Sequence, residues 1–316
     1  MEKALFYLII IFDICYLYQY YVYPQQLFIG SDVLEVMKDV RIRMKGQGLV
    51  FIGIFLGLNK YLQNTKRYEF LVLFFINLSI LFLLGFRTQL LVIAITLMYL
   101  YWKVVGINKK LFIYISIFSI ISFITYNNSE LLQKKLNFLI ERNETDNFYN
   151  SDYGRFSTLN YYINEHFKNS FEYFWGSGLP SESSVYGRYI LKLKDSFIIY
   201  ADWGFLGFSW MIGIPLTLFF LIFSIKAISI KVDKRYTYLS IWILFILLST
   251  IFTREFFRNG SFLLQAYVLY MIEKSNSGII KKQIRKTISI YMPDVTKNME
   301  TTTLVKKNIE KENDAN

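Results

Sequence analysis

The sequence predicts an all-α polytopic membrane protein, and its composition, its apolar runs and its few special residues support this class. Of the 316 residues, 54% are hydrophobic and only 19% are charged, whereas soluble domains carry about 25% charged residues. The net charge of +11 would suit a nucleic-acid-binding protein, but so apolar a chain does not. The single cysteine, Cys15, excludes a disulfide framework, and the single histidine, His166, excludes a multi-histidine metal site.

Apolar runs long enough to cross a membrane recur along the chain. A membrane-spanning helix needs about 20 mostly apolar residues, and each span must be helical because lipid offers the backbone no hydrogen-bond partner. The candidate spans, in chain order, are 4–22, 48–62, 68–86, 88–106, 111–126, 204–229, 236–253 and 260–273. The second and the last are short, so the sequence predicts seven or eight spans.

The first run is interpreted as a retained anchor. Lys3 followed by an apolar stretch resembles a signal peptide, but Asp13 interrupts the stretch and no small-residue cleavage site follows it.

The basic residues of the short loops set the predicted orientation. With eight spans, the lysines and arginines between spans two and three, four and five, and six and seven all fall on one side, which is therefore cytoplasmic, as are both termini. A transmembrane domain then covers 1–273, with one large extracytoplasmic loop at about 127–203. Residues 274–316 are polar and basic, and they predict a disordered cytoplasmic tail that touches anionic lipid.

Arginine is enriched on the predicted outer side, which the preference for basic cytoplasmic loops does not explain. The inside holds 17 lysines and 3 arginines, whereas the outside holds 7 lysines and 8 arginines. The outer arginines are Arg41, Arg43, Arg87, Arg142, Arg155, Arg188, Arg254 and Arg258. For any one of these arginines, snorkelling or ion pairing explains its position as well as ligand binding does. As a set they favour a phosphate ligand, because the planar guanidinium binds phosphate through two hydrogen bonds.

The large outer loop contains two predicted helices and a tight turn. The helices cover 129–142 and 152–169, and the second carries Phe156, Leu159, Ile163 and Phe167 at helical spacing, which predicts that this face packs on the membrane domain. Trp175-Gly176-Ser177-Gly178-Leu179-Pro180 predicts the turn. Asp195 precedes an apolar run, so it suits a helix N-cap or, equally, a carboxylate that takes a proton from a sugar hydroxyl.

The order of these motifs resembles the O-antigen and exopolysaccharide polymerases of the Wzy type, within the O-antigen polymerase and ligase superfamily. The resemblance covers about residues 40–260. It rests on four motifs: Arg41-Ile42-Arg43-Met44-Lys45-Gly46; Phe86-Arg87-Thr88-Gln89-Leu90-Leu91; Gly154-Arg155 followed by Trp175-Gly176-Ser177-Gly178; and Lys194-Asp195-Ser196-Phe197 followed by Gly204-Phe205-Leu206-Gly207. Members of this family usually have ten or more spans, so the chain is interpreted as a short member or as one that lacks N-terminal spans.

The resemblance implies a GT-C-like membrane fold in the bacterial cytoplasmic membrane and an inverting glycosyl transfer without metal or cofactor. A growing glycan on undecaprenyl pyrophosphate would be transferred to a lipid-linked repeat unit at the outer face, in the synthesis of capsule, exopolysaccharide or O-antigen. The family's pyrophosphate-binding role maps to Arg87 and Arg155 through their motifs. Arg188, Arg254 and Arg258 are added from their predicted side and position. A flippase and a chain-length regulator of the same pathway are the implied protein partners.

Three alternatives stay open from the sequence. One is a ligase that moves the glycan to another acceptor; related ligases carry a histidine where this chain has Lys194-Asp195, which disfavours the ligase and makes Asp195 the candidate base. The others are a transporter for a lipid-linked glycan and a non-catalytic assembly factor. Transporters tend to show internal repeats and intramembrane ionisable residues, and here only Asp13 lies well inside a span.

Overall fold

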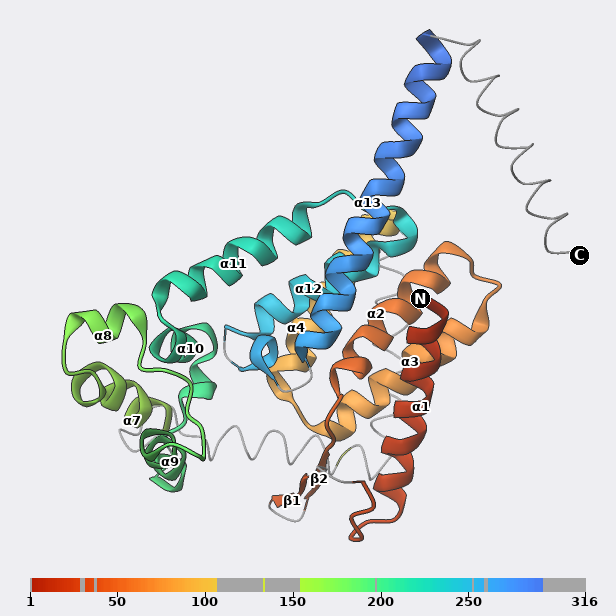
Figure 1. Cartoon of the computed structure of the whole chain (residues 1–316). Helices are drawn as coiled ribbons and strands as arrows, with labels where there is room; N and C mark the ends of the chain where they lie inside the picture. The colour runs from red at the N-terminus through yellow and green to blue at the C-terminus, as the bar shows by residue number, and fades with distance from the viewer. Residues whose placement is uncertain are drawn as a thin grey trace, which may run out of the picture.

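Helices form most of the chain that the structure describes. This structure is a computed structural model that describes residues 2–28, 32–36, 39–106, 133, 154–196, 198–251, 253–258 and 261–291. A main bundle holds α1 (Glu2–Tyr21), α2 (Gly48–Gln63), α3 (Tyr68–Leu84), α4 (Arg87–Val105), α12 (Thr237–Ser249) and α13 (Ser261–Tyr291) (Figure 1). The predicted helical class is therefore confirmed for the described residues.

A second group of shorter helices lies beside the bundle (Figure 1). It comprises α7 (Gly154–Asn160), the π-helix η1 (Tyr161–His166), α8 (Ser170–Trp175), α9 (Val185–Lys192), the 3₁₀ turns η2 (Leu193–Ser196) and η3 (Tyr200–Trp203), α10 (Gly204–Ile212) and α11 (Ile214–Ser229). The 3₁₀ turns η4 (Lys234–Tyr236) and η5 (Glu255–Phe257) flank α12. This arrangement brings the outer loop against α10 and α11.

Helix α12 forms the centre of the main bundle. It packs against α2, α4, α11 and α13, and Tyr238, Trp242 and Phe245 are fully buried. The Phe245 ring lies 4.8 Å from that of Phe51 in α2, between ring centroids. A helix that is apolar on all sides is buried on all sides, so the uninterrupted apolar run of α12 matches its central place.

Apolar side chains also cover the outside of several helices. Ile14 in α1, Leu91 in α4 and Ile222 in α11 are each more than 60% exposed. Apolar surface of this kind marks contact with a membrane or a partner. By length and composition, two helices of the described chain are able to cross a membrane, Glu2–Tyr21 and Thr88–Val105; Gly48–Gln63, Tyr68–Leu84 and Ile214–Ser229 are apolar but shorter. Seven or eight spans therefore remain a prediction, and the candidate span at 111–126 lies outside the described residues.

The predicted continuous span at 204–229 is wrong, because two helices meet there. α10 ends at Ile212 and α11 begins at Ile214, with Gly213 between them at φ +89° and Pro215 in the first turn of α11. Gly176 of the outer loop approaches so closely that a Cβ atom on Gly213 would lie 2.5 Å from the Trp175 carbonyl oxygen. The loop also pairs with the end of α10, since the Ser177 N–H donates to the Trp210 carbonyl (3.0 Å).

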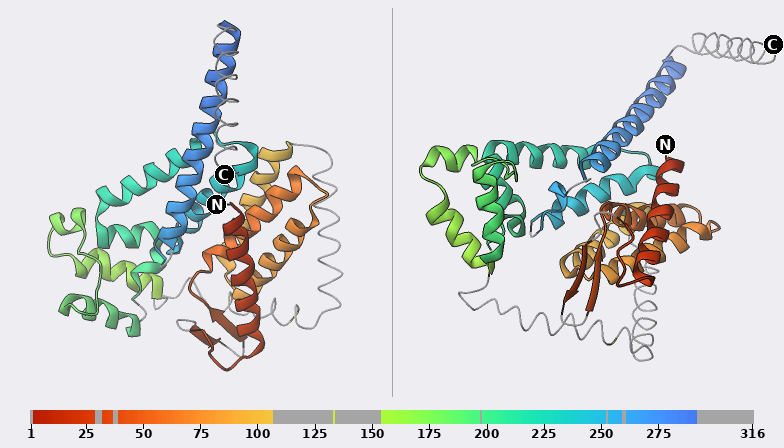
Figure 2. Two further views of the ribbon diagram at one scale, coloured as in Figure 1. Left: turned by 45° about the vertical axis from the view of Figure 1, so that its right-hand side comes forward. Right: turned by 60° about the horizontal axis from the view of Figure 1, so that its bottom comes forward.

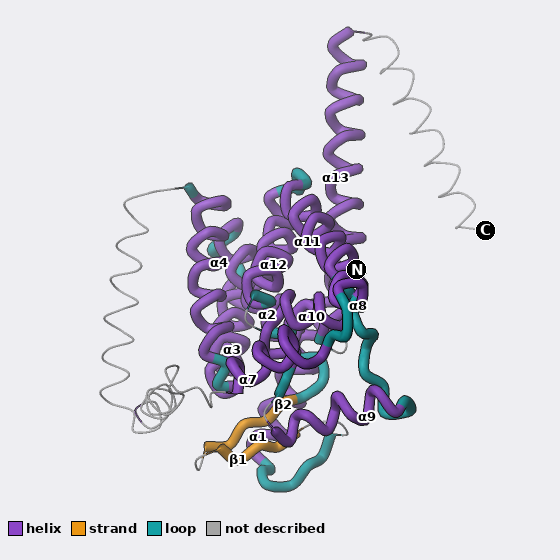
Figure 3. Tube along the Cα trace, turned by 90° about the vertical axis from the view of Figure 1, so that its left-hand side faces the viewer, coloured by secondary structure: helices purple, strands orange, loops and turns teal. Residues whose placement is uncertain are grey.

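A short β-hairpin that the sequence analysis does not predict accompanies the helices. β1 (Asp32–Val36) pairs antiparallel with β2 (Asp39–Arg43), with Asp32 opposite Arg43. The hairpin lies at the end of the molecule opposite the N-terminus (Figures 1 and 3). Alternation in Val33-Leu34-Glu35-Val36 and Val40-Arg41-Ile42-Arg43 is too short to stand out beside the long apolar runs.

The last helix corrects the predicted start of the tail. α13 continues from Ser261 to Tyr291, well past residue 273, and its second half projects away from the bundle in both views of Figure 2. It does so through Ser275, Asn276, Ser277 and Gly278, residues of low intrinsic helix propensity, so propensity does not explain the continuation. Residues 292–316 lie outside the described part of the chain.

In the loop predicted at about 127–203, the helix predicted at 152–169 is present as α7 and η1, and two of its four predicted packing residues do pack. Leu159 and Phe167 are partly buried beside Trp210 and Met211 of α10, together with the buried Tyr161 and Tyr162, whereas Phe156 and Ile163 are exposed. The reason is the π-turn of η1, since a π-helix pairs residues five apart and thereby rotates the following side chains relative to an α-helix. The helix predicted at 129–142 lies outside the described residues, apart from Gln133.

Candidate functional site

A buried glutamate organises the surface beside the hairpin. Glu255 begins η5 and is 3% exposed. Its Oε1 atom accepts hydrogen bonds from Gln89 Nε2 of α4 (2.9 Å) and from Arg258 Nη2 (2.5 Å). Two further hydrogen bonds fix the η5 turn. The Phe256 N–H donates to Thr250 Oγ1 (2.9 Å), and Gln265 Nε2 donates to the Phe256 carbonyl (2.6 Å). The Glu255 carboxylate therefore ties α4 to the segment between α12 and α13.

Two arginines bracket one aromatic ring at this place. The guanidinium carbons of Arg258 and Arg43 lie 5.3 and 5.5 Å from the centroid of Phe86, the residue before α4. Such cation–π contacts hold guanidinium groups in place. Burial raises the pKa of Glu255, and the charges of Arg258, Arg254 and Arg43 oppose that rise. The carboxylate thus lies within the field of three arginines.

A second carboxylate, Asp202 in η3, lies within the field of an overlapping set of arginines. The surrounding protein raises the pKa of Asp202, whereas the charges of Arg155, Arg254 and Arg43 lower it. Asp202 is exposed at the surface, with Arg155, Arg254 and Arg43 as its charged neighbours. The backbone of Arg155 is fixed beside η3, because Trp203 Nε1 donates to its carbonyl (2.9 Å).

Four arginines thus lie within electrostatic range of one or both of two carboxylates, with Arg258 in direct contact with Glu255. We call Arg43, Arg155, Arg254, Arg258, Glu255 and Asp202 the arginine cluster. Its members come from β2, α7, η3 and η5 and the residues beside η5. Four positive and two negative charges leave a local surplus of two positive charges. Arg254 is exposed, and its side chain makes no hydrogen bond or ion pair within the described part of the chain, so its guanidinium is open to an anionic ligand.

The predicted phosphate-binding residues divide into three groups. Arg155, Arg254 and Arg258 fall in the arginine cluster. Arg87 is the first residue of α4, two positions before Gln89, and its side chain is outside the description. Arg188 is exposed in α9 and donates to the carbonyls of Glu182 (3.2 Å) and Ser183 (3.5 Å), so nothing joins it to the cluster among the described residues.

The candidate base Asp195 lies in η2 and is exposed. It makes no hydrogen bond or ion pair with any residue that the structure describes. It is therefore not an N-cap, because it stands inside a 3₁₀ turn and the apolar run after it does not continue as a helix. Asp202 is the carboxylate that lies within the field of the arginines.

Sequence reasoning missed Glu255, Gln89 and Asp202 as members of this site. Glu255 stands between Arg254 and Arg258, and an acidic residue flanked by two outer arginines was a usable signal. Gln89 belongs to the same motif as Arg87. Nothing in the sequence indicates that Asp202 lies near Arg43, because these residues are far apart in the chain.

An apolar groove begins at the arginine cluster. The cavity has a volume of about 440 Å³ and is bordered at one end by Glu255 and Arg258. Its walls come from α1, the start of α2, α12 and α13, with Leu5, Leu8, Gly46, Leu49, Phe51, Ile246, Leu264 and Tyr267 among its lining residues. A charged end and an apolar length suit a lipid with an anionic head.

His166 lies in a separate aromatic pocket of the outer loop. Its Nε2 atom is 2.8 Å from Ser177 Oγ, which is also 2.6 Å from the Tyr186 hydroxyl. The ring lies tilted against that of Tyr162, with 4.6 Å between centroids and 55° between the ring planes. The N–H groups of Ser177 and Gly178 donate to Trp210 and Met211 carbonyls. With these donors occupied, the serine has no oxyanion-binding pair there, so the contact serves packing rather than acyl transfer.

Comparisons with known proteins give no indication of the function of this chain. Neither protein-family models nor curated sequences nor solved structures gave a match. Among the described residues, no three His, Cys, Asp or Glu side chains group closely enough to hold a metal ion.

Proposed function

We propose that this protein is a multi-pass membrane glycosyltransferase that polymerises lipid-linked glycan repeat units at the outer face of the bacterial cytoplasmic membrane. Its donor would be a glycan on undecaprenyl pyrophosphate. The observation that carries the proposal is the arginine cluster, in which three of the five arginines assigned to pyrophosphate share one site with Arg43. The apolar groove beside Arg258 supports it, because a polyprenyl chain requires an apolar surface next to its charged head.

The arginine cluster suits a leaving pyrophosphate. Anomeric substitution passes through an oxocarbenium-like state, and the negative charge that develops on the leaving group has to be stabilised. A hydrogen bond to a charged group contributes about 1.5–3 kcal/mol. Arg254 is open to a ligand, whereas Glu255 and Phe86 position Arg258. The surplus positive charge is thus supplied by this chain's own side chains.

The reaction balances with a single carboxylate as base. The acceptor hydroxyl oxygen bonds to the anomeric carbon, the bond from that carbon to the pyrophosphate oxygen breaks, and undecaprenyl pyrophosphate leaves. The hydroxyl proton passes to a carboxylate. Asp195 remains a candidate from sequence, and the neighbourhood of Asp202 makes it the stronger one. We therefore test both residues.

The direct experiment is reconstitution of the purified protein with lipid-linked repeat units from the parent strain, with EDTA present, followed by gel analysis of chain length. Wild type is expected to give a ladder. Arg254→Ala is expected to lower the rate roughly 10- to 100-fold, the loss of one charged hydrogen bond. Asp202→Asn is expected to lower it further than Asp195→Asn does.

Arg188→Ala is the matched control, since Arg188 is also an exposed outer arginine but binds only backbone carbonyls of its own segment. It is expected to retain the ladder. Equal losses in Arg188→Ala and Arg254→Ala would contradict a specific role for the cluster. No ladder from a folded wild-type protein would remove the polymerase proposal.

One observation favours a second candidate, a transporter of lipid-linked glycan. α10 and α11 form a broken helix at Gly213, and Asp13 is buried in α1, where Asn77 Nδ2 of α3 donates to its Oδ2 atom (2.9 Å). Broken helices and intramembrane acids are typical of transporters. Flipping of a fluorescent lipid-linked glycan by the reconstituted protein, without chain growth, would favour this candidate over the polymerase.

A further inference from the structure

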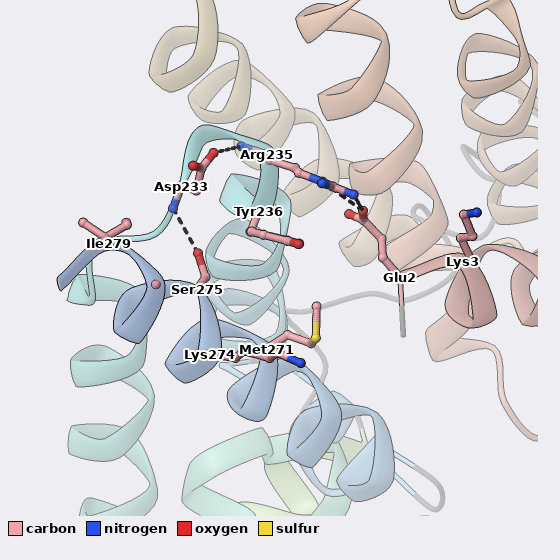
Figure 4. A pocket seen from close by; sticks show the side chains of 10 residues that line it. Glu2, Lys3, Asp233, Arg235, Tyr236, Met271, Lys274, Ser275 and Ile279 are labelled. Carbon is pink, nitrogen blue, oxygen red and sulfur yellow. Dashed lines mark hydrogen bonds and ion pairs between the residues drawn. The ribbon is translucent and has the colours of Figure 1, made fainter. Parts of the chain in front are cut away.

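A second charged cavity lies at the opposite end of α1 from the arginine cluster. Its volume is about 560 Å³, within the usual range for ligand sites. It is formed where the first turn of α1 meets the segment before α12 and the middle of α13 (Figure 4). The lining residues are Glu2, Lys3, Asp233, Arg235, Tyr236, Met271, Lys274, Ser275, Gly278 and Ile279.

Both acidic side chains of this cavity already have partners within the protein. Glu2 binds Lys60 Nζ (2.6 Å) through Oε1 and Arg235 Nη2 (2.9 Å) through Oε2, and Tyr238 donates to it as well (3.2 Å). Asp233 Oδ1 accepts the N–H of Arg235 (2.9 Å). Figure 4 shows Arg235 reaching across to Glu2. Glu2 is thus neutralised by two cations, whereas Asp233, which accepts only a backbone N–H among the described residues, keeps its negative charge.

By contrast, two of the basic side chains that line the cavity have no carboxylate partner among the described residues. Neither Lys3 nor Lys274 forms an ion pair within the described part of the chain, and Lys274 makes only a cation–π contact with Tyr270 (5.8 Å). The third basic residue of the lining, Arg235, is paired with Glu2, so the unpaired positive charge of the cavity comes from Lys3 and Lys274. Met271, Ile279 and the ring of Tyr236 supply an apolar wall. The cavity therefore combines free positive charge with apolar surface.

The position of the cavity indicates which anion it meets. α1 becomes apolar at Ala4, directly beside the cavity, and α1 is one of the two described helices long and apolar enough to cross a membrane. A site at the end of such a helix lies at the level of the lipid headgroups. Further along α13, Lys281, Lys282, Arg285 and Lys286 extend the basic sequence, which attracts anionic lipid.

We propose that this cavity binds the phosphodiester headgroup of an anionic phospholipid. Lys3, Lys274 and Arg235 would contact the phosphate oxygens, and Met271, Ile279 and Tyr236 would contact the glycerol and the first methylene groups. The site is independent of the glycosyl-transfer proposal, because none of its residues belongs to the arginine cluster or the apolar groove.

The test is native mass spectrometry of the full chain released from detergent, titrated with phosphatidylglycerol or with phosphatidylcholine. Wild type is expected to retain one phosphatidylglycerol more tightly than phosphatidylcholine. The double variant Lys3→Gln with Lys274→Gln is expected to weaken phosphatidylglycerol binding roughly tenfold or more, because each basic residue near a charged lipid surface contributes about fivefold.

The matched control is Lys66→Gln with Lys226→Gln, which removes two exposed lysines from outside the cavity. It is expected to bind phosphatidylglycerol as wild type does. Equal weakening in both double variants, or equal binding of the two lipids by wild type, would overturn the proposal. Stabilisation by glycerol phosphate or inorganic phosphate equal to that by the lipid would also overturn it, by assigning the cavity to a free phosphate. Melting temperatures of all variants confirm that they are folded.

Discussion

Each end of the molecule is organised around a glutamate, and the two glutamates differ in how deeply they are buried. At the hairpin end, the Glu255 side chain is 4% exposed and that of its partner Arg258 is 19% exposed. At the N-terminal end, the Glu2 side chain is 15% exposed and shared between Lys60 at 8% and Arg235 at 60%. Both carboxylates join elements distant in sequence. The first does so away from water, and the second does so partly in it.

This difference separates the residues that hold each end from those that meet ligands. An enclosed ion pair is costly to break, because the remaining charge stays buried. An exposed cation is solvated and contributes little to stability. By this criterion Glu255 and Arg258 hold the hairpin end, whereas Arg254 is available to a ligand. At the other end Glu2 and Lys60 hold the structure, whereas Lys3 and Lys274 are available.

The largest expected effect is that of Glu255→Ala. The substitution leaves Arg258 without its carboxylate and Gln89 without its acceptor, so unfolding free energy is expected to fall by about 3–5 kcal/mol. Denaturant titration in detergent micelles measures it. Glu69→Ala is the matched control, because the Glu69–Arg67 pair (2.7 Å) has both side chains about half exposed, and such pairs contribute about 0–1 kcal/mol. Similar losses in both variants would refute the distinction between enclosed and exposed pairs.

Glu2→Gln is expected to have an intermediate effect, a loss of about 1–3 kcal/mol. The cost arises from Lys60, which stays enclosed without a carboxylate, since Arg235 is free to turn to water. Arg235→Gln removes the other partner and is expected to cost less. The same titration compares them. A larger loss for Arg235→Gln than for Glu2→Gln would mean that the exposed Glu2–Arg235 pair, and not the enclosed Glu2–Lys60 pair, stabilises this end.

The comparison also shows what the sequence was able to predict. Helices α1 to α4, α12 and α13 follow their apolar runs, because burial on one or all sides leaves a local pattern. The break at Gly213 was hidden, because it depends on the approach of Gly176 from the outer loop. The type and side of the arginines predicted an anion site, which stays a prediction; Arg155 and Arg254 act on Asp202, and Arg254 and Arg258 act on Glu255. Their carboxylate partners were not predicted, because pairing between Gln89 and Glu255 arises only when α4 packs beside η5.

The smallest expected effect concerns His166, which lies in neither end. Burial lowers the pKa of His166, and the charge of Glu172 opposes this. The folded protein therefore binds the proton less readily than the unfolded chain, whose histidine titrates near pH 6.5. The stability contribution is complete above pH 6.5 and is lost as the pH falls below it. Because the ring is half-buried, the loss in melting temperature between pH 7.5 and 5.5 is expected to be less than about 3 °C.

The His166→Gln variant isolates this contribution. Glutamine keeps a polar group near Ser177 but does not titrate, so its melting temperature is expected to fall less between pH 7.5 and 5.5 than that of wild type. Tyr161 and Tyr186, which also contact His166 and Ser177, do not titrate in this range. Equal pH dependence in the two proteins would mean that the imidazolium is accommodated in the folded state, with Ser177 Oγ accepting its proton as readily as water does.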